Sequence, residues 1–152
     1  MHEAKIAAVV LAAGESRRFG RPKQLLRWNG RPLVVHIADT AWTAGLSPVV
    51  VVVGAEADAV LPMLVERPVE LVRNYRWQEG MSTSLYAGLA ALPPDVEAAL
   101  CMPVDQPLIT PRLLQRIVQT YRETGAGIVV PETERGRRGT PALFAREFFP
   151  DR

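Results

Sequence analysis

The chain has 152 residues, about one domain's worth, and a domain of that size can bury roughly two-thirds of its unfolded surface. With 48% hydrophobic residues, 22% charged residues and a net charge of +2, its composition excludes an intrinsically disordered chain, which combines low hydrophobicity with high net charge. Its longest apolar runs, residues 6–13 and 49–53, are too short to span a membrane, and its first residues lack the long apolar region of a secretory signal.

Short apolar runs alternate along the chain with segments of helical periodicity. The runs predict strands over residues 6–11, 48–53, 69–72, 98–104 and 128–130. Apolar residues at helical spacing predict helices over residues 33–44, 57–65, 82–92 and 110–124, although Pro62 disfavours the second helix. We expect Ser82 to cap the third helix, and Thr110 with Pro111 to start the fourth, which stops before Gly125.

This alternation of strands and helices predicts the fold class. We expect one α/β domain over residues 1–152, with three Rossmann-like layers: an open, mostly parallel sheet and helices on both of its faces. Ligands of such sheets bind beyond the carboxyl ends of the strands. The segments that follow strands should therefore converge at one edge, and these are residues 12–23, 54–56, 74–84 and 105–107.

The loop after the first strand has the composition of an anion-binding site. Gly14 and Gly20 allow backbone conformations that other residues avoid, and exposed N–H groups in such a turn form an anion-binding concavity. Arg18 and Lys23 would add charge-assisted hydrogen bonds to phosphate oxygens. The distribution of charge agrees, because residues 1–31 carry a net charge of +5 and the remainder carries −3. Such a local excess steers anions toward one place.

Composition alone leaves other interpretations of this loop open. An ordinary strand-to-helix turn with solvated arginines would look similar. The loop has neither the Walker A nor the Gly-x-Gly-x-x-Gly spacing, which disfavours P-loop proteins and dinucleotide dehydrogenases. Nucleic-acid binding is disfavoured because aromatic and basic residues do not alternate. Lys23 favours a phosphate site, because the chain has sixteen arginines and only two lysines and a compact ammonium suits a point contact between phosphate oxygens.

Four segments, taken in order, carry a family resemblance. They are Leu11-Ala-Ala-Gly14…Arg18-Phe19-Gly20…Pro22-Lys23-Gln24-Leu25-Leu26, Asn74-Tyr-Arg-Trp77…Gly80-Met-Ser-Thr-Ser84-Leu85, Val104-Asp105-Gln106-Pro107 and Arg138-Gly139-Thr-Pro141…Phe144. The set resembles the MobA-like nucleotidyltransferases and, among them, the molybdenum cofactor cytidylyltransferases (MocA-like). The resemblance implies a fold like that of the nucleotide-diphospho-sugar transferases. It also implies transfer of CMP from CTP to the phosphate of molybdopterin, with Mg²⁺ as cofactor and pyrophosphate as the second product.

The resemblance also assigns roles to residues. Lys23, Arg18 and Asp105 would be catalytic, and Asp105 would hold Mg²⁺. Arg138 and Gly139 would contact the acceptor. The nucleotide would be bound by Leu11, Ala12, Ala13, Gly14, Arg18, Lys23, Gly54, Asn74, Gly80, Ser82 and Ser84. By itself, an aspartate that ends a strand is more often a turn former, so its metal role depends on the resemblance.

The remaining candidate residues are assigned structural roles. The proposed reaction needs little acid–base chemistry because the attacking phosphate is already anionic, so the reaction mainly requires positioning and charge neutralisation. His2 and His36 are therefore expected to be structural or on the surface, and Cys101 is expected to be an inert core residue. A single cysteine forms no internal disulfide and favours a reducing, cytoplasmic setting.

The identities of the nucleotide and the acceptor depend on the resemblance alone. Leu-Ala-Ala-Gly favours CTP, because the guanylyltransferase branch favours Leu-Ala-Gly-Gly. The alternatives are a related transferase that uses GTP or a sugar phosphate, and a non-catalytic protein that binds the molybdenum cofactor for a client molybdoenzyme. The family usually continues past the position of Arg152 into a segment with a second metal-facing carboxylate, so we expect this domain to lack its C-terminal segment.

Overall fold

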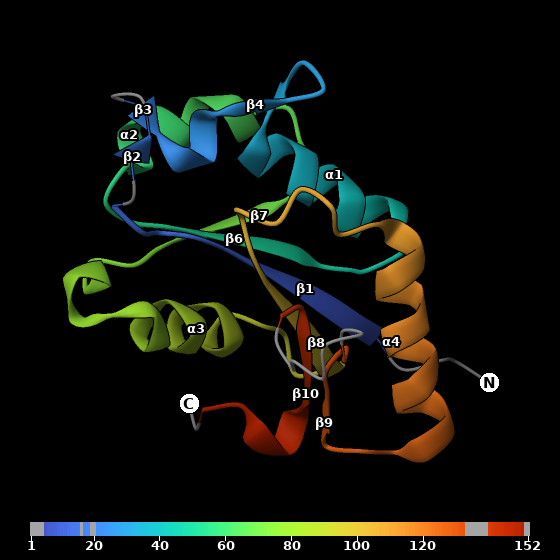
Figure 1. The fold of residues 1–152 in the computed structure, drawn as a ribbon. Helices are drawn as coiled ribbons and strands as arrows, with labels where there is room; N and C mark the ends of the chain where they lie inside the picture. The colour runs from blue at the N-terminus through green and yellow to red at the C-terminus, as the bar shows by residue number, and fades with distance from the viewer. Residues whose placement is uncertain (1–4, 16, 19–20, 133–139, 151–152) are drawn as a thin grey trace.

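The structure, a computed structural model, describes residues 5–15, 17–18, 21–132 and 140–150 and has three layers (Figure 1). The central sheet consists of β7 (Glu70–Arg73), β6 (Val49–Val53), β1 (Lys5–Ala12), β8 (Val96–Pro103), β10 (Ala142–Ala145) and β9 (Ile128–Val129), in that spatial order. Helices α1 (Leu33–Thr43) and α4 (Pro111–Thr124) cover one face, and α3 (Met81–Ala90) covers the other.

Shorter elements join these layers. Two hairpins follow β1: β2 (Arg17–Arg18) pairs with β3 (Arg21–Pro22), and β4 (Arg27–Trp28) pairs with β5 (Arg31–Pro32). The helix α2 (Ala57–Val60) follows β6, and single 3₁₀ turns cover Lys23–Leu25, Leu61–Leu64, Trp77–Glu79 and Arg146–Phe148. In the part of the chain that the structure describes, no helix is long and apolar enough to cross a membrane.

The strands are continuous apolar runs because both faces of the sheet are covered. Ala8 and Val10 of β1 pack under α1 and α4, whereas Val9 between them packs under α3. All five residues of β6 are valines, and all are buried. Gly88 lets α3 approach the sheet closely, since a Cβ atom there would lie 2.4 Å from Val9 Cγ1. The predicted three-layer, mostly parallel architecture is confirmed: β7, β6, β1 and β8 run parallel.

The fourth predicted helix has the expected ends. The Thr110 hydroxyl accepts a hydrogen bond from the Leu113 N–H at 3.1 Å, and Pro111 occupies the first helical position. Gly125 ends the helix with a left-handed backbone conformation, at φ 67°. Thr110, Pro111 and Gly125 therefore act as the sequence predicts.

Three local predictions need correction. Ser82 is not the cap of α3: the helix begins at Met81, and Gly80 precedes it with φ 115°, a backbone conformation that suits glycine. The predicted helix over residues 57–65 changes into a 3₁₀ turn at residue 61, because the ring of Pro62 disfavours a continuing α-helix. The antiparallel strand β10 was not among the predicted strands. It has only four residues, and it pairs antiparallel with β8, which is distant in the sequence.

Candidate functional site

Three neighbouring cavities lie beyond the carboxyl ends of β1 and β8 and share lining residues. The inner pocket, of about 150 Å³, lies between Leu11, Ala13, Gly14, Trp77, Gly80, Met81 and Ser84. The central cleft, of about 100 Å³, is lined by Lys23, Gln24, Asp105 and the β1 loop. The outer groove, of about 460 Å³, is lined by Trp28, residues 105–109, Leu113, Thr140 and Pro141. Leu11, Gly14 and Met81 line both the inner pocket and the central cleft, and Asp105 lines both the cleft and the groove.

An ion pair in the central cleft joins two of the predicted catalytic residues. Lys23 Nζ donates to Asp105 Oδ2 at 2.7 Å, although the two residues are 82 positions apart in the sequence. Their side chains are 28% and 38% exposed, so both groups remain within reach of a ligand in the cleft. A cation that suits phosphate oxygens and a carboxylate that suits a metal ion therefore meet at one point.

The Gln24 side chain holds the loop that precedes Lys23. Its buried amide nitrogen donates to the backbone oxygens of Ala12 and Gly14, at 2.9 and 2.8 Å. In a trans peptide the N–H group points opposite to the C=O group. The N–H groups that follow these two carbonyls, those of Ala13 and Glu15, are consequently turned away from Gln24. Both carbonyl oxygens are thus engaged by an N–H donor of the Gln24 amide, which fixes the conformation of the loop.

Asn74 joins the end of β7 to the first turn of α3. It is 5% exposed, and its amide nitrogen donates to Ser84 Oγ at 2.8 Å and to Thr83 Oγ1 at 2.9 Å. Its carbonyl oxygen accepts from the Arg76 N–H at 2.9 Å. Ser84 lines the inner pocket, whereas Ser82 is exposed and is not among the residues that form it. The Asn74 side chain is therefore engaged within the protein.

Gly54 is the point where the loops after β1 and β6 come together. A Cβ atom at this position would lie 2.8 Å from Ala13 Cβ and 2.9 Å from Trp77 Cβ. Such distances leave no room for a side chain, so Gly54 lets these residues close the floor of the inner pocket. Among the other predicted residues, Arg18 is described only through its backbone in β2, and Arg138 and Gly139 lie outside the described residues.

His36 and Cys101 have structural roles in the structure, and only Cys101 belongs to the buried core. His36 Nε2 lies 3.0 Å from the Pro107 oxygen and links α1 to the segment after β8. Cys101 is buried in β8, and this burial raises the pKa of its thiol to about 12. The thiol therefore stays protonated near neutral pH and is a poor nucleophile.

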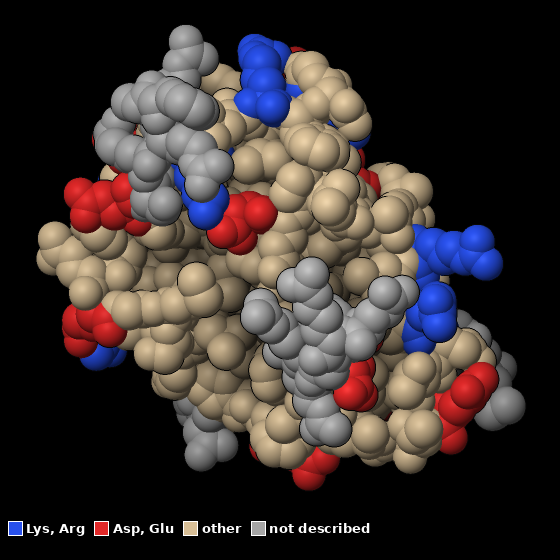
Figure 2. Space-filling view, in the orientation of Figure 1, with Lys and Arg blue, Asp and Glu red and all other residues tan. Residues whose placement is uncertain are grey.

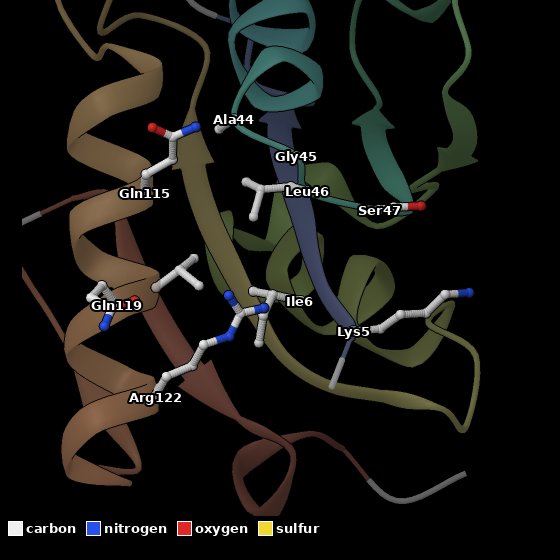
Figure 3. Close-up of a pocket in the computed structure, with 10 residues that line it drawn as sticks. Lys5, Ile6, Ala44, Gly45, Leu46, Ser47, Gln115, Gln119 and Arg122 are labelled. Atoms are coloured by element: carbon white, nitrogen blue, oxygen red, sulfur yellow. The ribbon is translucent and has the colours of Figure 1, made fainter. Parts of the chain in front are cut away.

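A further cavity, of about 470 Å³, lies at the opposite edge of the sheet. Figure 3 shows Lys5 and Ile6 of β1 on one side of it, and Gln115, Gln119 and Arg122 of α4 on the other. Lys5 is paired there with Asp95 at 3.2 Å. The loops that hold the Lys23–Asp105 pair do not line this cavity. Its large volume is therefore not a reason to place the chemistry at that edge.

Comparison with known proteins identifies the family. Residues 8–152 match the family described as the MobA-like NTP transferase domain. The chain belongs to this family. The match covers every segment of the proposed site, and it confirms the resemblance drawn from the sequence motifs.

Relatives of this MobA-like domain carry several names. It is 37% identical to nicotine blue oxidoreductase of Paenarthrobacter nicotinovorans over 118 residues, which make up 77% of this chain and 57% of that protein. It is 32% identical to the bifunctional protein GlmU of Heliobacterium modesticaldum over 80% of this chain and 27% of that protein. It is 28% identical to a probable molybdenum cofactor guanylyltransferase of Pyrococcus horikoshii, over 95% of this chain and 71% of that protein. The chain thus spans less than two-thirds of the first two proteins.

Solved structures share the architecture. Rv0371c of Mycobacterium tuberculosis superposes with a TM-score of 0.84 at 32% identity, over 96% of this chain and 74% of that one. A complex of Rv0371c with manganese gives a TM-score of 0.78, at 28% identity over 94% of this chain and 72% of that one. A nucleotidyl transferase from Methanothermobacter gives 0.76, with the same identity and coverage.

The MobA-like site offers one described carboxylate to a metal ion. Asp105 is the acidic residue that lines the central cleft, and the described residues contain no cluster of three or more metal-ligating side chains. Magnesium is commonly held by one or two carboxylates together with substrate phosphates and water. The donor set therefore suits a metal that arrives with a phosphate-bearing substrate.

Several residues that shape the site had no role predicted from the sequence. Gln24 belongs to the first of the four family segments, but its contacts with the loop carbonyls depend on the turn that brings it back to β1. Trp28 and Gln106 line the outer groove, which is formed by segments distant in the sequence. Asn29 and Gly30 both have positive φ, and an Asn-Gly pair favours a tight hairpin turn. This pair was the local signal that Trp28 ends the first strand of a hairpin.

Proposed function

We propose that this MobA-like domain is a nucleotidyltransferase that moves CMP from CTP to the phosphate of molybdopterin and releases pyrophosphate. The observation that carries the proposal is the Lys23–Asp105 pair at 2.7 Å. Both residues line the central cleft, and Asp105 also lines the outer groove. A transfer reaction needs two substrate sites on either side of a phosphate site, and the order of the three cavities suits this requirement.

In the proposed reaction, an oxygen of the acceptor phosphate attacks the α-phosphorus of CTP. The bond from that phosphorus to the oxygen bridging the α- and β-phosphates breaks, and pyrophosphate leaves with the electron pair. The attacking oxygen is already anionic, so no side chain has to remove a proton. Catalysis then depends on alignment of the two phosphates and on neutralisation of their charge.

Lys23 supplies positive charge at this point. Its ammonium has three N–H donors and uses one of them for Asp105, which leaves two for phosphate oxygens. Gln24 assists by donating hydrogen bonds to the carbonyl oxygens of Ala12 and Gly14, which fixes the loop before Lys23. We assign Arg18 to the same phosphates on the basis of its motif. Asp105 would hold Mg²⁺, which would offset charge on the phosphates when bound.

We assign the inner pocket to the nucleoside of the donor, and we identify the donor as CTP. Gly14, Gly80 and Ser84 line this pocket, in agreement with the motif-based assignment. The Leu11-Ala-Ala-Gly14 sequence supports CTP, whereas the guanylyltransferase name of the P. horikoshii relative supports GTP. Arg138 and Gly139 remain proposed acceptor contacts, and a client molybdoenzyme in a reducing cytoplasm remains a proposed partner.

The test is pyrophosphate release by the purified chain with Mg²⁺ and each of CTP, GTP, ATP and UTP, with and without molybdopterin. We expect release that requires both CTP and molybdopterin. A preference for GTP would identify GTP as the donor. Nucleotide binding with no pyrophosphate release from any of the four nucleotides would favour the accessory-protein alternative. Lys5→Met is the matched control for Lys23→Met, since Lys5 is the other lysine and lies at the opposite edge of the sheet.

A redox activity is the second candidate, favoured by the 37% identity with nicotine blue oxidoreductase. The same preparation, assayed with nicotine blue and a nicotinamide reductant, would show a change in dye absorbance if this candidate were correct. Such turnover without nucleotide transfer would replace the proposed function.

A further inference from the structure

The segment after β8, residues 105–108, carries Asp105 between two buried residues. Val104 and Ile109 flank the segment and are 7% and 6% exposed, whereas Asp105 is exposed. Core packing therefore fixes the two ends of the segment, and hydrogen bonds have to fix the part between them. In the view of Figure 2, charged side chains are scattered over a mostly uncharged surface. The position of one carboxylate on such a surface depends on its local contacts.

Two hydrogen bonds connect this segment to other parts of the fold. The Val104 N–H donates to the Leu11 oxygen at 3.2 Å, which ties the start of the segment to β1. The second bond comes from a side chain of α1, because His36 Nε2 lies 3.0 Å from the Pro107 oxygen. Pro107 follows Asp105 by two residues. The histidine therefore contacts the exposed part of the segment, close to the carboxylate.

Both ring nitrogens of His36 have partners, and these partners define the tautomer of the ring. A carbonyl oxygen can only accept a hydrogen bond, so Nε2 carries the proton that faces the Pro107 oxygen. A guanidinium can only donate, and Arg31 Nη2 lies 3.4 Å from Nδ1, so Nδ1 presents its lone pair to Arg31. The ring is therefore the neutral Nε2–H tautomer, and its one N–H donor is directed at the segment that carries Asp105.

The His36 ring itself is held from two elements. Its neighbours in α1, Val35 and Ile37, are 4% and 0% exposed, so the first turn of the helix is fixed on the sheet. Arg31 of β5 is fixed as well, because it pairs with Asp39 of α1. A donor whose origin and tautomer are both fixed can orient the group that it contacts, as the outer partners of metal ligands do.

We propose that His36 is a positioning residue for Asp105. Through the Pro107 oxygen, the Nε2–H group fixes the segment so that the carboxylate of Asp105 stays in the central cleft beside Lys23, where it would hold the metal ion. The inference rests on the proposed function for the reaction that this carboxylate serves. It gives His36 a role beyond the link between α1 and the segment after β8, since small displacements of a reacting group slow catalysis strongly.

The test compares His36→Gln with His36→Leu. The glutamine amide can donate to the Pro107 oxygen in place of Nε2, whereas leucine has no donor. Hydrogen exchange measured by mass spectrometry reports on residues 104–109, and calorimetric titration with Mn²⁺ at saturating CTP reports on the metal site. We expect His36→Leu to raise the exchange rate of this segment about fivefold and to weaken Mn²⁺ binding about fivefold, because one hydrogen bond is lost. His36→Gln should resemble the wild type in both measurements.

Transfer kinetics separate positioning from a general loss of stability. His36→Leu should lower kcat about tenfold and leave the KM for CTP unchanged, because the segment after β8 does not line the inner pocket. His36→Gln should restore kcat. Trp42→Ala is the matched control on the same helix: this tryptophan is 54% exposed and lines neither the central cleft nor the outer groove, so exchange, Mn²⁺ affinity and kcat should all stay unchanged.

The outcomes distinguish this proposal from the proposed function. An equal loss of Mn²⁺ affinity in His36→Gln and His36→Leu would overturn the positioning role, because the hydrogen bond would then not be the cause. Wild-type exchange and Mn²⁺ affinity in His36→Leu would overturn it as well, and so would a wild type that binds no Mn²⁺. The expected exchange and Mn²⁺ results, without transfer by the wild type, would retain the positioning role and reject the transferase activity.

Discussion

Replacement of Lys23 or Asp105 should separate catalysis from stability. At 2.7 Å two unit charges attract by about 1.5 kcal/mol in water, and side-chain ordering offsets part of this gain. Because the two side chains are 28% and 38% exposed, we expect Lys23→Met or Asp105→Asn to lower the unfolding free energy by at most about 1 kcal/mol. For a chain of this length that is a decrease in Tm of about 2–4 °C.

The same substitutions should impair transfer far more. A charged group directed at the transferred phosphate stabilises the transition state by about 3–4 kcal/mol, so its loss should reduce the transfer rate by about 10²- to 10³-fold. The assays are thermal unfolding by calorimetry and single-turnover transfer from CTP. Asp105→Asn keeps the side-chain volume and removes only the charge, which makes it the sharper of the two variants.

The Lys5–Asp95 pair provides a matched control. It joins the same residue types at 3.2 Å, with side chains that are 50% and 60% exposed. Lys5→Met and Asp95→Asn should therefore leave the transfer rate unchanged and lower Tm by no more than the central-cleft variants. Transfer by Lys23→Met and Asp105→Asn within threefold of the wild type would refute the assignment, and so would an equal loss in Lys5→Met.

Three further predictions follow from the packing and the loop. Gly88→Ala should destabilise the fold by about 1–3 kcal/mol in urea unfolding, because its Cβ atom would lie 2.4 Å from Val9 Cγ1; unchanged stability would show that α3 moves freely on the sheet. Burial raises the Cys101 pKa to about 12 from an ordinary value of 9. The thiol of the unfolded chain ionises at a lower pH than the thiol of the folded chain. The stability that the neutral thiol contributes below pH 9 should therefore be lost between pH 9 and 12, and the fall in unfolding free energy over this range should be smaller in Cys101→Ala. Gln24→Leu should raise the KM for CTP about tenfold by freeing the loop carbonyls, as steady-state kinetics would measure; an unchanged KM would restrict Gln24 to a structural role.

Most of the layer architecture could be predicted because local sequence specifies it. The five valines of β6 have no polar position that could face water, which indicates a strand buried on both faces. Thr110 and Gly125 carry their capping chemistry within a few residues of the helix ends. The strand β10 lacks such a signal, since its pairing partner β8 lies about forty residues earlier. Ser82 has the right residue type for a cap, but Gly80 places the helix start one residue earlier than Ser82.

The candidate site was predictable to the extent that parallel strands share an edge. Lys23 lies in the segment after β1, and Asp105 follows the parallel strand β8, so the two residues were expected to converge. The 2.7 Å distance between Lys23 Nζ and Asp105 Oδ2 agrees with this expectation. The position of Gln24 within the motif did not indicate its direction toward Ala12 and Gly14. The outer groove combines the β4 hairpin, the segment after β8, the first turn of α4 and the two residues before β10, and no local pattern specifies such a combination.

The most direct test of the central claim follows the α-phosphate of the nucleotide. The purified chain is incubated with Mg²⁺, molybdopterin and CTP labelled at the α-phosphorus, and the products are separated and weighed by mass spectrometry. We expect a labelled product with the mass of molybdopterin joined to CMP, together with unlabelled pyrophosphate, and no such product from Asp105→Asn. Labelled CTP recovered unchanged, under conditions in which the folded protein binds both substrates, would contradict this expectation.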